Sequence, residues 1–190
     1  PLRFQLLTFP DTPMKNANWP PLVRVQHWLT VLLMILCIGA VWSHEAFDKS
    51  NPMRAQLMQL HFLSGGVIGL LTVLRVVTRA VVSGPVHSMT PLVTLLAKAG
   101  HLGLYLLMIL LPLCGYVAVS GKGLPINLLG WLEIPPLPVS SGVAKVFKEL
   151  HEGLGNALIA LVALHVAAAL FHALLLKDKV LQSMLGRAAE

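Results

Sequence analysis

Four long apolar stretches alternate with shorter polar segments along the chain. They cover about residues 22–42, 57–77, 101–120 and 154–176. Each has close to the ~20 apolar residues that a helix needs to cross the hydrocarbon core of a bilayer. The pattern therefore predicts an all-α integral membrane protein, a four-helix bundle made by a single domain over residues 1–190. Pro112 falls inside the third stretch, where we expect a kink that a membrane helix tolerates.

The composition supports the same class of protein. Of the 190 residues, 56% are hydrophobic and 12% are charged, whereas soluble domains carry about 25% charged residues. We expect no secretory signal peptide, because the first 20 residues contain no apolar run long enough for one. Cys37 and Cys114 lie in apolar runs. Two cysteines form neither a zinc pattern nor a disulfide framework, so we interpret them as small buried hydrophobic residues.

The positive residues favour one orientation in the membrane. The side that holds both chain ends carries nine of the 14 Lys and Arg residues: Arg3, Lys15, Arg24, Arg75, Arg79, Lys98, Lys177, Lys179 and Arg187. The other side carries five: Lys49, Arg54, Lys122, Lys145 and Lys148. The richer side should be cytoplasmic, which predicts an N-in, C-in topology. Because the net charge of +6 is divided among short loops rather than gathered on one face, we expect no nucleic-acid partner.

The longest connection, residues 121–153, lies on the outer side and contains four prolines. Its Lys-bearing part, residues 143–150, is a candidate for a short interfacial helix. A loop of this length in a compact protein usually has a function. Lys122, Lys145 and Lys148 could steer an anion toward the outer face, although ordinary loop lysines are the more common case.

Histidines carry the candidate chemistry. Six of the eight lie in or at the edge of the apolar stretches: His27, His61, His101, His151, His165 and His172. An ionisable residue inside a bilayer is costly, so each of these is a candidate functional residue. A hydrogen-bonded interior histidine is the alternative for any one of them.

His151 and His165 lie 14 residues apart in the last stretch. At ~1.5 Å and ~100° per residue, they face the same side of one helix about 21 Å apart. That separation suits the two edges of a hydrocarbon core ~30 Å thick. Opposite helix directions put His61 at the outer depth of His151, and His27 at the inner depth of His165. Two pairs from different helices suit bis-imidazole ligation of two stacked haems better than zinc, which takes four ligands or three plus water.

Nearby residues support this interpretation. Glycines follow the histidines at spacings of four or eight residues: Gly65, Gly69 and Gly155. They could leave room for a flat macrocycle or allow close helix packing. Three arginines gather at the inner end: Arg24, Arg75 and Arg79. They could pair with haem propionates or extend to the interface.

Two histidines stay ambiguous from the residues alone. His172 matches the depth of His27 at least as well as His165 does, because it lies seven residues further along and about 20° away on the helix. His101 opens the third stretch at the inner face. It could ligate a metal, bond a propionate, hold a quinone head group or be a simple interfacial histidine.

The segments that carry these residues resemble the bacterial cytochrome b561 family. The resemblance rests on VQHWLTVLL around His27, MQLHFLSGGVIGLLTVLRVVTR around His61, GHLGLYLLMILLPLCGYVAVSGKG in the third stretch, and ELHEGLGNALIALVALHVAAALFH in the fourth. It covers about residues 22–180. One departure is Lys98, which replaces a histidine commonly expected three residues before His101 and weakens the case for a His-rich inner site.

The resemblance implies a di-haem b cytochrome of the bacterial inner membrane, with His27, His61, His151 and His165 as ligands. It thereby favours His165 over His172. The implied function is transmembrane electron transfer with a ubiquinone-type quinone, in some members as a superoxide:quinone oxidoreductase. The alternative is a membrane-anchor cytochrome b subunit that relays electrons between quinone and a periplasmic redox protein. Membrane lipid and a second copy of the chain complete the expected partners.

Overall fold

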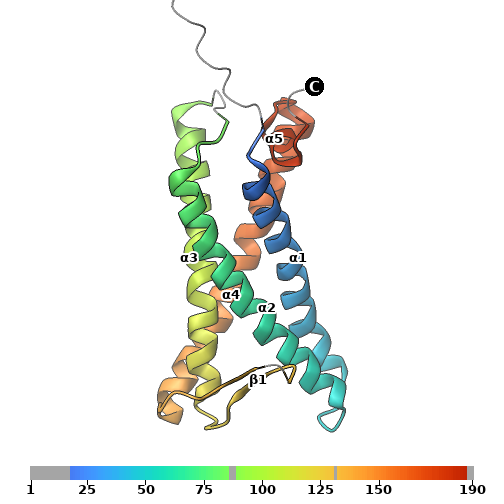
Figure 1. Ribbon diagram of the computed structural model, residues 1–190, viewed down its shortest axis with the longest axis vertical. Helices are drawn as coiled ribbons and strands as arrows, with labels where there is room; N and C mark the ends of the chain where they lie inside the picture. Colours follow the sequence, from blue (N-terminus) through green and yellow to red (C-terminus); the bar gives the residue numbers. More distant parts are fainter. Residues whose placement is uncertain (1–17, 86–88, 131, 188–190) are drawn as a thin grey trace, which may run out of the picture.

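Four long helices make up most of the computed structural model, which describes residues 18–85, 89–130 and 132–187 (Figure 1). They are α1 (Pro21–Ser43), α2 (Pro52–Val81), α3 (Pro91–Ser120) and α4 (Ser141–Phe171). Each is long and apolar enough to cross a membrane, so the predicted four-helix membrane bundle is confirmed. Arg3 and Lys15, which count toward the predicted orientation, lie outside the described residues.

The start of α1 and the short helix α5 (Val180–Leu185) lie at the same end of the bundle, as an even number of crossings requires (Figure 1). We call this the inner end, following the charge bias, and the opposite end the outer end. The backbone N–H of Trp19, just before α1, donates to the Ser183 carbonyl of α5 at 3.1 Å, which ties the start of the first helix to the last.

Prolines and polar caps set the helix starts. Pro21, Pro52 and Pro91 each occupy the first turn of a helix, where the missing N–H has no partner to lose. The side chains before α2 and α4 accept backbone hydrogen bonds, Asn51 from Met53 at 2.9 Å and Ser140 from Val143 at 3.3 Å. Such caps satisfy N–H groups that the helix itself leaves free.

Two helices, α3 and α4, begin ten or more residues earlier than the apolar stretches predict. α4 begins at Ser141, so residues 143–150 are helical but continuous with the fourth spanning helix. The expectation of a separate interfacial helix there is therefore corrected. α3 begins at Pro91, which puts Lys98 and His101 inside a helix rather than in a loop and at its start. An apolar run in the sequence locates the part of a helix that lies in lipid. It does not predict how far the helix continues into polar residues beyond the membrane.

The helices pack in chain order. α1 packs against α2, α2 against α3 and α3 against α4, while within the described residues α4 makes few close backbone approaches to α1 or α2. The core lies around Ile68, Met108 and Leu158. Pro112 stays inside a continuous α3 and faces Gly69, where an added Cβ would lie 2.9 Å from its Cγ. The glycine thus admits the proline ring between α2 and α3.

A small hairpin, not foreseen from the sequence, covers the outer end (Figure 1). It pairs β1 (Ile126–Leu128) with β2 (Leu132–Ile134) in antiparallel register, with Ile126 opposite Ile134. β1 packs against α2. The Tyr116 hydroxyl of α3 donates to the Pro135 carbonyl at 2.6 Å and fixes the exit from the hairpin.

The inner end is closed by contacts of α5 and of Trp19. A π-helical turn, η2 (His172–Leu176), follows α4 and leads to α5 through Lys177, whose φ is 51°. The Trp28 indole N–H donates to the Met184 carbonyl at 3.3 Å. The Arg79 guanidinium lies 3.9 Å from the centre of the Trp19 ring, a cation–π contact that helps order this end.

Candidate functional site

The structure brings four of the predicted site histidines together as two pairs. The ring centroids of His61 and His151 are 6.0 Å apart, and those of His27 and His165 are 6.3 Å apart. The first pair joins α2 to α4 near the outer end, and the second joins α1 to α4 nearer the inner end. In both pairs, a histidine of α4 faces a histidine of a helix, α2 or α1, whose backbone makes few close approaches to α4.

This spacing fits a metal ion between two imidazoles. A metal–nitrogen bond of about 2 Å on each side, with half a ring at each end, spans roughly 6 Å. Within the ranges that the structure describes, no three His, Cys, Asp or Glu side chains are grouped to hold a metal ion. The remaining ligands would have to come from the bound group itself, as a porphyrin supplies them. The residues present therefore fit a haem at each pair.

The three glycines proposed to make room for a macrocycle behave differently. A Cβ at Gly155 would meet no heavy atom within 4 Å, so this position is open. At Gly65 it would lie 3.7 Å from the Cys37 sulfur, and at Gly69 it would meet Pro112. Helix packing therefore explains Gly69, while Gly155 leaves space beside the outer pair.

Both outer histidines are held through Nδ1. That of His61 lies 3.0 Å from the Cys37 carbonyl, and that of His151 lies 2.9 Å from the Leu111 carbonyl. A carbonyl can only accept, so Nδ1 carries the proton and Nε2 is left as the metal-binding nitrogen. Gly115 makes this fit possible, because an added Cβ would lie 3.1 Å from the His151 ring.

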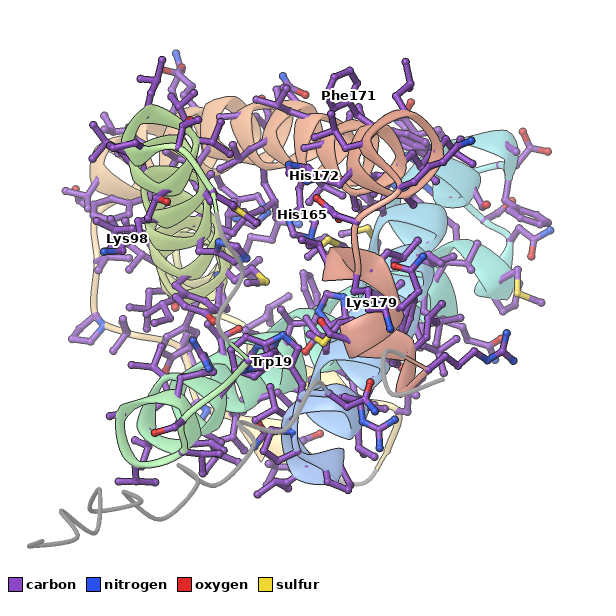
Figure 2. All side chains as sticks on the ribbon, turned by 90° about the horizontal axis from the view of Figure 1, so that it is seen from above. Trp19, Lys98, His165, Phe171, His172 and Lys179 are labelled. Atoms are coloured by element: carbon purple, nitrogen blue, oxygen red, sulfur yellow. The ribbon has the colours of Figure 1, made fainter. Side chains whose placement is uncertain are left out.

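The inner histidines lie in a different setting. Neither His27 nor His165 has an Nδ1 hydrogen bond among the contacts of the described chain. A third imidazole, His101, has its ring centroid 5.5 Å from that of His165 and bonds the Ala97 carbonyl through Nδ1 at 2.6 Å. Figure 2 shows His165 directed from α4 toward the middle of the bundle, with Lys98 on the outside of α3.

His172 has its own partner. Its Nδ1 contacts the carboxylate of Asp178, just beyond the end of η2. His165 instead meets His27 across the bundle. The contacts thus favour His165 as the partner of His27, and ligation by either side chain stays a prediction.

The three inner arginines already contact protein groups. Arg75 is 9% exposed, and its Nη1 donates to the Val23 carbonyl at 2.6 Å. Arg24 packs against Gly186, and its buried Nε has no hydrogen-bond partner in the described residues. Arg79 stacks on Trp19. A guanidinium has five N–H donors, so donors remain available, and the pairing with propionates stays a prediction.

The outer lysines are exposed, but they are not equivalent. Lys148 forms an ion pair with Glu152 at 2.9 Å, which offsets its charge. Gly121 packs so closely on Ala144 that an added Cβ would lie 2.2 Å from the alanine Cβ. This contact brings Lys122 beside the first turns of α4, which carry Lys145. These two lysines are the better candidates for attracting an anion.

Cys37 is the site residue that sequence reasoning missed. Its sulfur lies 3.3 Å from Nδ1 of His61, and it is half-buried rather than a buried apolar filler. Cys114, in contrast, is buried as predicted. Nothing in the sequence fixes the rotation of α1 against α2, which decides whether Cys37 faces His61.

Residues 18–187 match the sequence profile of the family described as prokaryotic cytochrome b561. The chain is 34% identical over 188 residues to cytochrome b561 homolog 2 of Escherichia coli (strain K12), covering 96% of this chain and 97% of that protein. Homolog 1 of the same organism is 27% identical over 163 residues, 85% of this chain and 93% of that protein. The probable superoxide oxidase CybB of Yersinia pestis is 29% identical over 165 residues, 85% and 92% of the two chains. The similarity includes all four long helices.

Proposed function

The chain belongs to the prokaryotic cytochrome b561 family of multi-pass bacterial membrane proteins, and we propose that it transfers electrons across the membrane through two b-type haems. His61 and His151 hold the outer haem, and His27 and His165 hold the inner haem. The observation that carries the proposal is the presence of two histidine pairs at two depths, with centroids 6.0 and 6.3 Å apart. Bound haem supplies the one-electron redox chemistry that side chains lack.

The residues of the chain define what kind of electron carrier this is. Two imidazoles would hold a haem at each pair, and such a site would leave no protein-free position on the iron for oxygen. The Cys37 and Leu111 carbonyls orient the outer imidazoles. The apolar helices keep water away from the interior. This arrangement supports electron transfer at the edge of a bound group rather than substrate activation at a metal.

The proposed electron donor is superoxide at the outer end, and the proposed acceptor is a ubiquinone-type quinone. Two superoxide anions, one quinone and two protons give two dioxygen molecules and one quinol. The name of the Yersinia pestis relative, a probable superoxide oxidase, supports this choice. The exposed Lys122 and Lys145 also support superoxide as the donor, because a local positive charge raises the encounter rate with an anion.

Cofactor content is the first test. The detergent-purified protein should contain two b-type haems per chain by pyridine haemochrome assay, with a low-spin spectrum typical of bis-histidine ligation. A single haem, or none, would contradict the proposal. A high-spin spectrum would contradict the assignment of two imidazoles to each iron.

Activity is the second test. The purified chain should reduce a soluble quinone when superoxide is supplied enzymatically. The double substitution Lys122→Glu and Lys145→Glu should lower kcat/KM about tenfold at low salt and less at high salt. Lys49→Glu, on the loop between α1 and α2, controls for general surface charge when it is compared with the single substitutions Lys122→Glu and Lys145→Glu. A protein that is inert until a periplasmic redox protein is added would instead favour the membrane-anchor alternative.

A further inference from the structure

We propose that the outer haem has the lower reduction potential, so that the contacts of this protein direct electrons from the outer end to the inner end. The inference rests on the proposed function, because it requires haems at both histidine pairs. It follows from two differences between the pairs: the hydrogen bonds made by the ligands and the charge buried beside them.

The outer ligands are the better electron donors. The Nδ1–H groups of His61 and His151 donate to main-chain carbonyls at 3.0 and 2.9 Å. Such a bond gives an imidazole partial imidazolate character and raises its basicity toward a metal. A more basic ligand stabilises ferric over ferrous iron, which lowers the reduction potential.

Cys37 strengthens this effect at His61. Its thiol lies 3.6 Å from the His61 carbonyl, to which it donates, so the lone pairs of its sulfur are available to Nδ1 at 3.3 Å. The His61 Nδ1–H is thereby shared between the carbonyl and the sulfur of one residue. Cys37 is accordingly a positioning residue that acts on the outer haem through His61.

The inner ligands lack these acceptors and lie near a buried cation. No Nδ1 acceptor contacts His27 or His165 in the described ranges. Arg75 is 9% exposed, and its guanidinium donates to the Val23 carbonyl at 2.6 Å, one helical turn before His27 on α1. A guanidinium stays protonated, and a positive charge in a low-dielectric interior favours the less positive ferrous state. The reduction potential of the inner haem should therefore be higher than that of the outer haem.

The charges near the outer pair do not reverse this order. Glu152 adjoins His151, but its exposed carboxylate is paired with Lys148 at 2.9 Å, and exposed pairs act weakly. With haem bound at both pairs, one electron would pass from the outer group, which is oxidised, to the inner group, which is reduced, and no bond would form or break. The gradient makes this direction downhill and the reverse direction uphill.

A redox titration of the holoprotein tests the proposal. Optical and EPR monitoring should resolve two midpoints separated by at least about 59 mV, which is tenfold in the one-electron equilibrium constant. The lower midpoint should be the one lost in His151→Ala, and the higher the one lost in His165→Ala. Equal midpoints or the opposite assignment would overturn the inference. Fewer than two haems in the wild-type protein would overturn the proposed function instead.

Substitutions of the residues beside the ligands test the two causes of the difference in potential. Cys37→Ala should raise the outer midpoint alone, and Cys37→Ser should restore it toward the wild-type value because a hydroxyl can accept the same hydrogen bond. Cys114→Ala, the matched control on α3, should shift neither. Arg75→Gln should lower the inner midpoint alone. If Arg75→Gln does not accumulate as folded protein, the Cys37 series decides, and an unchanged outer midpoint in Cys37→Ala would refute the role of that residue.

Discussion

The two ends of the bundle hold their histidines in different ways. At the outer end, main-chain carbonyls of α1 and α3 accept from His61 and His151, and a hairpin covers that end. At the inner end, His27 and His165 lie near a third imidazole, His101, and near buried Arg75. No carbonyl orients the inner pair in the described part of the chain.

The two ends differ in what sets the orientation of the imidazole rings before a cofactor binds. A helix carbonyl is part of the backbone scaffold and cannot rotate away, so it holds an imidazole in one orientation. The outer site is therefore preorganised, in the sense that supporting bonds set its geometry in advance. The rings of the inner site depend on packing and on the bound group. We expect the outer haem to be bound more tightly and the inner haem to exchange more readily.

The largest effect should come from removal of a ligand at either end. His151→Ala and His165→Ala should each lower haem content from two to one per chain, because a single imidazole cannot hold both faces of the iron. His172→Ala should retain both haems, since its ring contacts Asp178. Pyridine haemochrome assay of the purified variants measures this. Loss of the inner haem in His172→Ala, with retention in His165→Ala, would show that the inner pair is assigned to the wrong histidine.

A smaller effect, confined to one end, should follow from Gly115→Val. The Cβ alone would lie 3.1 Å from the His151 ring, so a branched side chain should push the ring away from the Leu111 carbonyl. Loss of such a supporting contact typically weakens metal binding by about 10–100-fold. Transfer of haem to apomyoglobin should accelerate for the outer haem only.

Gly100→Val is the matched control for this substitution. It lies on the same helix, where an added Cβ meets no heavy atom within 4 Å. If Gly115→Val released the inner haem first, the two ends would not be independent, and the contrast between them would fail.

The smallest effect concerns the contact between α1 and α5. Trp28→Phe removes the indole N–H that donates to Met184 at 3.3 Å, and should lower the free energy of unfolding by about 1 kcal/mol or less. Denaturant titration in detergent measures it. Trp42→Phe, which changes a 67% exposed side chain near the outer end of α1, should lower stability less. Equal losses in both variants would indicate that α5 adds no stability through this bond.

The arrangement of the spans and the depths of the histidines followed from the sequence. Apolar runs of spanning length located the four helices, and a 14-residue spacing placed His151 and His165 on one side of α4. The start of α4 did not follow, because Lys145, Lys148 and Glu149 lie on a helical extension beyond the apolar run. The strands β1 and β2 have three residues each, too few to show the alternation of apolar and polar residues by which a strand is predicted.

The support of the outer histidines could not be predicted for a different reason. Its acceptors are the carbonyls of Cys37 and Leu111, and every residue has a carbonyl, so residue type carries no signal. The rotation of each helix about its axis decides which carbonyl faces a ring. Packing determines that rotation, for example the seating of Pro112 on Gly69.

The position of α4 in the chain has a consequence for how the protein is made. α4 is the last of the long helices, and it supplies one member of each histidine pair. A nascent polypeptide that has inserted α1 and α2 exposes His27 and His61 on separate helices, without partners. Under the ligation proposed above, cofactor loading would therefore follow synthesis and insertion of nearly the whole polypeptide. A truncated chain that ends before residue 151 would lack both complete sites and could not become a partly active redox protein.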